Sequence, residues 1–252
     1  MAFAFTTWKR AKGRRSCSFP DGRCRGGSGK NRSRTSPRII VIALDPRSQG
    51  ESDKPADGNY PERRARDYKE LVDHLKLAPA VLVGWSMAVP EIMAYVDQFA
   101  ATDLSGVVLV DGFVVVDDAV AKVFPMWLKS LEIDRKGFTD RFVHGMYKKP
   151  QPESYYERLI AAALQTPTNS AVTLGVGMIG RMDWSPVFPK LAQTPVLSVV
   201  TKVLIKQLDP LRAALPQLQS EVFEDAGHAL FVDEAERFNL VVQKFIEGAP
   251  AK

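Results

Sequence analysis

The chain has 252 residues, of which 45% are apolar and 25% charged, a balance typical of one globular domain, with or without a small insertion. The formal charge of +5 is unevenly distributed: residues 1–38 hold 11 of the 34 Lys and Arg but one of the 29 acids, so they carry +10 and the remainder carries −5. This distribution argues against a nucleic-acid-binding face on the folded body, and no apolar run approaches the roughly 18 to 20 residues that span a bilayer.

Residues 1–37 are expected to form a basic, low-complexity segment that is loop or disordered. From position 9 onwards the stretch is rich in Arg, Gly and Ser and nearly lacks aliphatic side chains, so it cannot bury enough apolar surface to offset its ordering entropy. Both cysteines, Cys17 and Cys24, fall here, which argues against a disulfide scaffold and favours a reducing, cytoplasmic location. An organelle transit peptide is the alternative interpretation of this Arg- and Ser-rich start.

The folded domain is predicted to begin at residue 38. The β-branched run 39–44 is typical of a strand buried on both faces of a parallel sheet, and a turn-rich stretch follows it. The next expected elements are a helix over 61–76, a strand over 80–83, a helix that ends near Phe99 and a strand over 106–110.

In the second half of the chain the expected secondary structure changes twice, first to helices alone and then back to alternating strands and helices. Residues 113–189 contain helical patterns, such as 117–131 and 153–165, without a clear strand, and they predict a helical cap over the carboxyl ends of the sheet strands. After the cap we expect strands over 195–200 and 220–223 and a closing amphipathic helix over 233–246. Strands that alternate with helices predict an α/β fold with a mostly parallel central sheet, whose core comprises residues 38–112 and 190–252.

The clearest chemical signal lies in the turn Gly84-Trp85-Ser86-Met87-Ala88, between a hydrophobic strand and a helix. Small residues are needed two positions either side of the serine, because larger side chains would collide with the strand and helix that the turn joins. Such a turn lifts Ser86 above the sheet as a nucleophile and points the Met87 amide at a developing oxyanion. The alternative is that Ser86 only caps the helix.

His228 is the candidate catalytic base. It follows the short strand 220–223 and precedes the closing helix, so its loop can reach a serine at the strand ends. The other two histidines, His74 in a helix pattern and His144 in the insertion, have no equivalent placement. The alternative is a solvated loop histidine.

Three motifs in this order resemble those of the α/β-hydrolase family, in particular its esterases, cofactor-free haloperoxidases and perhydrolases. Residues 45–55, DPRSQGESDKP, are similar to the family's D-x-R-G-x-G-x-S-x-x-P turn, with Ser48 where glycine is usual. The turn 84–88 resembles its nucleophile elbow, with Ala88 in place of the last glycine, and Gly227-His228 resembles its base loop. The match runs from residue 38 to the C-terminus and implies a Ser-His-acid triad, a helical cap and no required cofactor or metal.

The sequence departs from the family pattern at the triad acid. Many relatives place it in a G-x-x-D turn after the strand that is 195–200 here, but this chain continues without a carboxylate until Asp209, nine residues past the strand. Asp111, at the end of the preceding strand, is the favoured candidate, since a carboxylate there could orient His228 and stabilise its imidazolium. The alternative is that Asp111 only accepts hydrogen bonds from loop amides.

A second departure concerns the oxyanion hole. Relatives carry an earlier strand that ends in His-Gly, whose following loop supplies a second amide, and residues 1–37 contain no histidine and no such strand. We therefore expect the chain to lack the N-terminal strands and half of the oxyanion hole. An ordered amide from residues 2–8 close to Ser86 would contradict this expectation.

The resemblance implies hydrolysis of a small carboxylic ester through an acyl-enzyme, with perhydrolase or haloperoxidase-like chemistry on the same triad as the near alternative. A non-catalytic relative without a complete oxyanion hole is the rival from another class.

Nucleic-acid binding by residues 9–34 is not expected, because the segment has one aromatic residue, Phe19, for base stacking. The oligomeric state stays open. Apolar pocket walls are expected from Trp85, Phe124, Met126 and Trp127.

Overall fold

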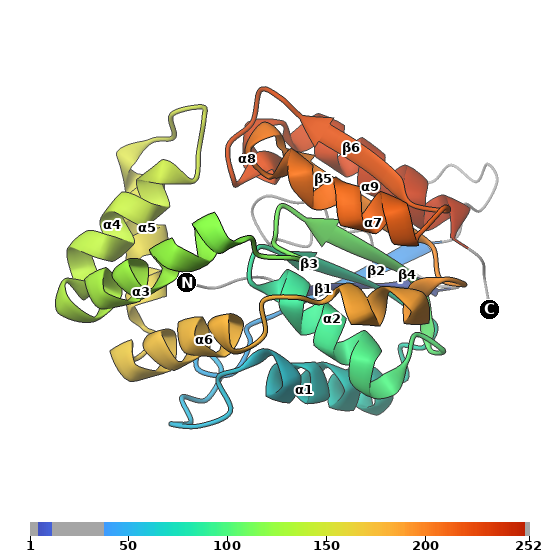
Figure 1. Ribbon diagram of the computed structural model, residues 1–252, viewed down its shortest axis with the longest axis horizontal. Coiled ribbons are helices and arrows are strands. Elements are labelled where there is room, and N and C mark those ends of the chain that lie inside the picture. Colours follow the sequence, from blue (N-terminus) through green and yellow to red (C-terminus); the bar gives the residue numbers. More distant parts are fainter. Residues whose placement is uncertain (1–4, 12–37, 250–252) are drawn as a thin grey trace, which may run out of the picture.

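The computed structural model describes residues 5–11 and 38–249, and the strands of this part form one six-stranded sheet in the order β2-β1-β3-β4-β5-β6 (Figure 1). The four strands β3 to β6 are parallel, which confirms the predicted α/β class. The strands are β1 (Phe5–Ala11), β2 (Arg38–Leu44), β3 (Ala80–Trp85), β4 (Leu104–Val110), β5 (Val196–Thr201) and β6 (Gln219–Phe223).

Helices cover both faces of the sheet, with α1 and α2 on one face and α9 on the other (Figure 1). The helices of the core are α1 (Pro61–His74), α2 (Ala88–Phe99), α7 (Leu208–Ala214), α8 (Leu230–Asp233) and α9 (Ala235–Gly248), and two 3₁₀ segments, η1 (Ser185–Leu191) and η2 (Lys202–Gln207), accompany them. Each strand and helix predicted for residues 39–110 and 195–246 has a counterpart within a few residues of its expected bounds.

The two-residue period of the strands divides the core into two layers. Leu82 and Leu109 point to the layer under α1 and α2, whereas their neighbours Val81 and Val108 point to the layer under α9. All four side chains are at most 2% exposed. Because both faces are apolar, the strands read as continuous hydrophobic runs, as expected of a parallel sheet covered on both sides.

Four helices are inserted between β4 and β5, and Figure 1 shows them grouped together at one side of the sheet. They are α3 (Asp118–Ile133), α4 (Arg135–Gly145), α5 (Glu153–Leu164) and α6 (Thr168–Gly180). An isolated antiparallel bridge between Val115 and Asp183 joins the two chain segments that lead into and out of the group. The inserted helices thus occupy the stretch in which the sequence predicted helices without a clear strand.

The prediction of a fully buried, parallel strand over 39–44 is wrong in two respects. β2 lies at the edge of the sheet and pairs with β1 in the antiparallel sense. It is therefore incompletely covered, and Ile40 is 36% exposed. A run of β-branched residues specifies a strand, but it does not specify the direction or the number of its partners.

The prediction that all of residues 1–37 form loop or disorder is wrong for β1. This strand lies between β2 and β3 and is antiparallel to both, with Thr6 opposite Val83. Its sequence opens with Phe-Thr-Thr-Trp, residue types that favour strands, although the residues that follow are basic. The sheet therefore does contain an N-terminal strand, contrary to expectation. Residues 12–37, with both cysteines and Phe19, lie outside the described part.

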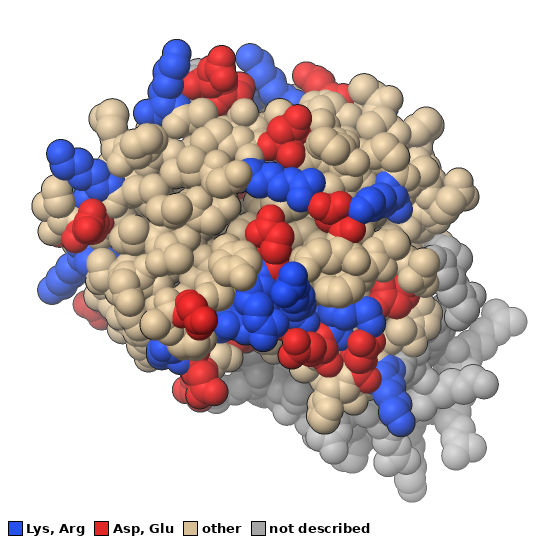
Figure 2. Space-filling model, turned by 60° about the horizontal axis from the view of Figure 1, so that its bottom comes forward, with Lys and Arg blue, Asp and Glu red and all other residues tan. Residues whose placement is uncertain are grey.

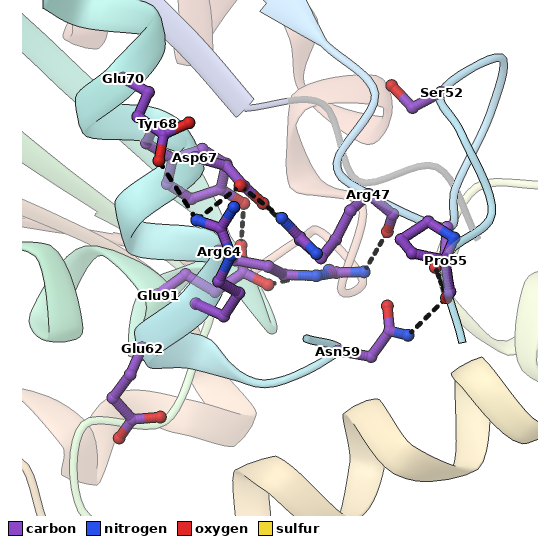
Figure 3. Close-up of polar contacts among 12 residues, drawn as sticks. Arg47, Ser52, Pro55, Asn59, Glu62, Arg64, Asp67, Tyr68, Glu70 and Glu91 are labelled. Atoms are coloured by element: carbon purple, nitrogen blue, oxygen red, sulfur yellow. Dashed lines mark hydrogen bonds and ion pairs between the residues drawn. The ribbon is translucent and has the colours of Figure 1, made fainter. Parts of the chain in front are cut away.

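The turn-rich loop after β2 is fixed to α1 by a network of charged side chains (Figure 3). Arg47 donates to both carboxylate oxygens of Asp67, at 2.5 and 2.6 Å. Arg64 bridges the loop and α2, because it donates to the Arg47 carbonyl and to the Glu91 carboxylate, each at 2.9 Å. Tyr68 donates to the same carboxylate. Bidentate pairing, as between Arg47 and Asp67, fixes the orientation of the loop relative to α1 in addition to stabilising the contact.

On the face that carries α1, basic and acidic side chains are interspersed, and neither sign forms a continuous field (Figure 2). Some charged side chains of the described part form ion pairs, for instance Arg63 with Asp67 and Lys190 with Asp97. Among the described helices, none combines the length and the apolar composition that a bilayer crossing requires.

Candidate active site

Ser86 sits on a sharp turn between β3 and α2. Its φ of 57° lies in the left-handed region, and its amide donates to the Val110 carbonyl of the neighbouring strand at 2.9 Å. A Cβ at Gly84 would approach the Ala88 carbonyl oxygen to 2.8 Å, and one at Gly112 would approach the Ser86 carbonyl oxygen to 2.5 Å. The glycine before the serine is thus required by backbone packing, while Ala88, which replaces the family's last glycine, is accommodated and 2% exposed.

The structure brings together the three residues that the sequence singled out for catalysis. The Nε2 atom of His228 is 2.9 Å from the Ser86 hydroxyl oxygen, and its Nδ1 atom is 2.7 Å from a carboxylate oxygen of Asp111. These side chains come from the ends of β3 and β4 and from the loop after β6, positions 142 and 117 residues apart in the chain. The parallel sheet gathers them because its strands end at a common edge.

Asp111 is 2% exposed and its second carboxylate oxygen is also occupied. That oxygen accepts hydrogen bonds from the backbone amide and the hydroxyl of Thr201, at 2.7 and 2.9 Å. Thr201 ends β5, the strand after which many relatives carry their acid, and here it holds Asp111 instead. Asp209, the alternative acid, lies in α7, and among the described residues it forms no hydrogen bond or ion pair with His228, whose Nδ1 atom is bonded to Asp111 instead.

The His228 loop is held from two sides. The indole N–H of Trp85 donates to the His228 carbonyl at 2.9 Å, and the two rings lie 4.9 Å apart. The Gly227 amide donates to the buried carboxylate of Asp233, which also accepts from the amides of Lys148 and Lys149 between α4 and α5. One carboxylate therefore ties the loop of the candidate base to the inserted helices.

A small cavity of about 40 Å³ lies between the Ser86 turn and the inserted helices. Its wall is mostly apolar, with contributions from Gln49 of the loop after β2, Met87 beside the serine, and α3 to α6. The lining residues are Gln49, Met87, Trp127, Leu131, Arg135, Phe138, Thr139, Phe142, Ala163, Thr166, Ala171 and Leu174. By volume it has room for a few water-sized groups.

Of the four predicted pocket residues, Trp127 lines this cavity and the others do not. The prediction for Met126 is wrong: its side chain is 70% exposed, because it lies on the outer side of α3. Phe124 packs against Phe113 at 6.4 Å between ring centroids, and Trp85 holds the His228 loop. Neighbouring residues of a helix face different directions, so a run of aromatic and apolar residues cannot all face one cavity.

The Met87 amide is available at the start of α2, where none of the hydrogen bonds among the described residues uses it. The predicted absence of a second oxyanion amide stays a prediction. β1 runs antiparallel to β3, so its first described residue, Phe5, lies toward the edge at which Ser86 sits, and residues 2–4 lie outside the described part.

Several residues of the site carry no recognisable signal in the sequence. Each of them contacts a part of the molecule that only the tertiary structure brings near it. Thr201 donates to the carboxylate of Asp111 from another strand, and Asp233 accepts from three loop amides. Arg135 lines the cavity under the inserted helices. Across the residues that the structure describes, no cluster of His, Cys, Asp and Glu is arranged to hold a metal ion.

Comparisons with known proteins agree with this architecture. The model of a family described as "Alpha/beta hydrolase family" matches residues 28–239. An esterase from Exiguobacterium antarcticum is similar in structure, with 21% identity, a TM-score of 0.75 and coverage of 83% of this chain and 81% of that one.

Two further solved structures show the same fold. A bromoperoxidase from Bacillus anthracis has 19% identity, a TM-score of 0.74 and coverage of 83% of this chain and 82% of its own. An esterase from Rhodococcus sp. has 19% identity, a TM-score of 0.70 and coverage of 84% and 80%. At these identities the structural similarities establish the fold.

Proposed function

Since the chain belongs to the alpha/beta hydrolase family, we propose that it is a serine hydrolase that cleaves a small carboxylic ester. The observation that carries the proposal is the hydrogen-bonded series from Ser86 through His228 to the buried Asp111, with distances of 2.9 and 2.7 Å. An isolated serine hydroxyl is a weak nucleophile, and a histidine within hydrogen-bond reach, itself oriented by a carboxylate, is the arrangement that activates it.

In the proposed reaction the Ser86 oxygen attacks the ester carbonyl while His228 Nε2 takes the hydroxyl proton. The negative charge that develops on the carbonyl oxygen is stabilised by the Met87 amide at the start of α2. When the intermediate collapses, the C–O bond to the alcohol breaks and His228 returns the proton to the leaving oxygen, so an acyl-Ser86 ester remains.

The second half repeats these steps with water. His228 takes a proton from water, the resulting oxygen nucleophile attacks the acyl carbon, and Ser86 recovers its proton as the acid departs. Asp111 keeps His228 in the tautomer whose Nε2 can accept a proton and stabilises the imidazolium that follows. Thr201 supports this role, because its two hydrogen bonds fix the Asp111 carboxylate.

A second candidate reaction uses hydrogen peroxide in place of water at the acyl-enzyme, which would release a peracid. The same three residues would serve, and one of the similar structures is a bromoperoxidase. An assay of acyl-enzyme turnover with and without peroxide separates the two, since a perhydrolase forms peracid in the presence of water and a hydrolase releases the carboxylic acid alone.

The proposal is tested by intact-mass labelling with a fluorophosphonate, which phosphonylates an activated serine. We expect one stoichiometric adduct on the wild-type protein and none on the Ser86→Ala and His228→Ala variants, because the first lacks the nucleophile and the second lacks its base. Ser130→Ala is the matched control: its hydroxyl bonds to the Met126 carbonyl on α3, away from the site, so labelling should be unchanged.

Absence of an adduct on a demonstrably folded wild-type protein would contradict the proposal. The chain would then be a non-catalytic relative, whose elbow and base are present but not activated. Labelling that survives in Ser86→Ala would instead assign the reactive serine to another position.

A further inference from the structure

Arg135 is a positive charge in the wall of the cavity beside Met87. Two of its three nitrogen atoms bond to uncharged acceptors: Nη1 donates to the Thr139 hydroxyl at 2.5 Å and Nη2 to the Ala163 carbonyl at 2.9 Å. The Nε atom is buried and has no hydrogen-bond partner. Within the described residues, no carboxylate forms an ion pair with this guanidinium.

The nearest acid in sequence does not neutralise Arg135. Asp134 caps α4 through the Gly137 amide and lies against the exposed Arg141. Arg135 also occupies the first turn of α4, where the helix dipole is positive and a cation is unfavourable. The Ala163 carbonyl, in the last turn of α5, offsets part of this charge. Burial lowers the pKa of Arg135, yet an arginine keeps its proton in proteins.

A second unused donor borders the same cavity. The Thr166 hydroxyl is buried without a hydrogen-bond partner, and Thr166 follows α5 directly after the turn that Arg135 contacts. A half-buried guanidinium without a counter-ion and a buried hydroxyl without a hydrogen-bond partner both cost free energy, and a ligand that supplies the missing charge and acceptor would offset that cost.

We propose that this cavity binds an anionic group of the substrate, a carboxylate, through Arg135 and Thr166. This inference rests on the proposed function, in which the substrate is an ester whose carbonyl group lies beside Ser86 and Met87. A carboxylate has two acceptor oxygens for these donors and supplies the missing counter-charge. With a cavity of about 40 Å³, the carboxylate belongs a few atoms from the ester carbonyl, so the substrate class is the half-ester of a short dicarboxylic acid.

The kinetic test compares methyl hydrogen succinate with methyl 4-amino-4-oxobutanoate, its uncharged amide counterpart, in a pH-stat. We expect the wild-type kcat/KM to favour the carboxylate by about 10- to 100-fold, the usual effect of a hydrogen bond to a charged group. Arg135→Gln should abolish the preference. Arg141→Gln is the matched control, because this arginine lies on the same helix with 65% of its side chain exposed, and it should keep the preference.

Equal turnover of the two esters by the wild-type protein would overturn the anion site while leaving ester hydrolysis intact. If Arg135→Gln fails to fold, Thr166→Val decides: it removes the hydroxyl at nearly constant volume, so a smaller preference supports the site and an unchanged preference overturns it.

A calorimetric measurement separates this inference from the failure of the proposed function. Succinate and succinamide are titrated into the Ser86→Ala protein, which retains the cavity and cannot turn over an ester. Succinate should bind at least about 10-fold more tightly than succinamide, and adding Arg135→Gln should remove the difference. Equal binding of the two, or a difference that survives Arg135→Gln, would overturn the anion site even if fluorophosphonate labelling succeeds.

Discussion

Three residues around the site have left-handed backbone conformations, which residues other than glycine rarely adopt. Ser48, Ser86 and Asp111 have φ values of 65°, 57° and 43°. Each such residue costs on the order of 1–3 kcal/mol and persists where its surroundings fix it. Strand hydrogen bonds do so here: the Ser86 amide donates to the Val110 carbonyl, and the Asp111 amide donates to the Val199 carbonyl at 2.8 Å. The sheet therefore fixes the positions of the proposed nucleophile and acid.

The role proposed for Asp111 predicts the effect of Asp111→Asn. An asparagine keeps an oxygen for Thr201 but presents an NH₂ group to His228, which favours the tautomer that cannot accept the serine proton. We expect kcat to fall by about 10⁴-fold, as in serine proteases with this change, with little effect on KM. Ester hydrolysis kinetics measure the change, and Asp209→Asn is the control. A comparable loss in the Asp209 variant would transfer the role to that residue.

At the scale of elements, α1 and α2 are joined by a buried ion pair. Arg64 and Glu91 are 1% and 2% exposed, and Tyr68 donates to the same carboxylate (Figure 3). Arg64 also bonds to the loop after β2, which contributes Gln49 to the cavity wall. The orientation of two helices and the position of one cavity wall thus depend on a single carboxylate.

Removing one partner of this pair should destabilise the protein strongly. Glu91→Ala leaves the Arg64 charge buried and uncompensated, and we expect a loss of about 3–5 kcal/mol in the free energy of unfolding. Urea titration followed by circular dichroism measures it. Asp73→Ala is the matched control on α1: its pair with Lys69 is solvent-exposed and should be worth less than about 1 kcal/mol. Equal effects of the two changes would show that the buried pair has no special role.

Some helices and strands could be predicted from local sequence patterns and others could not. Helices α1, α2 and α9 and strands β3 to β5 could be predicted because their apolar periods reflect the faces they bury. β1 could not, since a short strand followed by basic residues is specified by its partners β2 and β3 and not by its own composition.

The same distinction applies to the site. Ser86 has a local turn pattern, and His228 and Asp111 follow strand ends, so the sequence could predict that these three side chains lie close together. Thr201 and Asp233 bond to partners distant in the chain, and no local pattern reports such a contact.

At the scale of the whole molecule, β1 connects β2 to the rest of the sheet. Without it, β2 has no hydrogen-bonded neighbour, and β3 presents an open edge next to the Ser86 turn. Open edges of apolar strands promote association between chains.

Deletion of residues 1–11 tests this arrangement. We expect a lower Tm and aggregation during size-exclusion chromatography, because the sheet loses a strand from its interior. A deletion of residues 250–252, which lie beyond α9, is the control and should leave both properties unchanged. If the 1–11 deletion elutes in the same oligomeric state as the full chain and has an unchanged Tm, β1 does not belong to the stable sheet.

The pairing of β1 with β2 also bears on how freely this chain can vary in length. Ala11 and Arg38 are directly opposite one another, so β1 ends and β2 begins at the same place in the sheet. When the two ends of a chain segment are held together, the entropy cost grows only as the logarithm of the number of residues between them, about 0.6 kcal/mol for each doubling. Evolution could therefore lengthen, shorten or replace the stretch between β1 and β2 at small thermodynamic cost, while the strand register on either side remains the same.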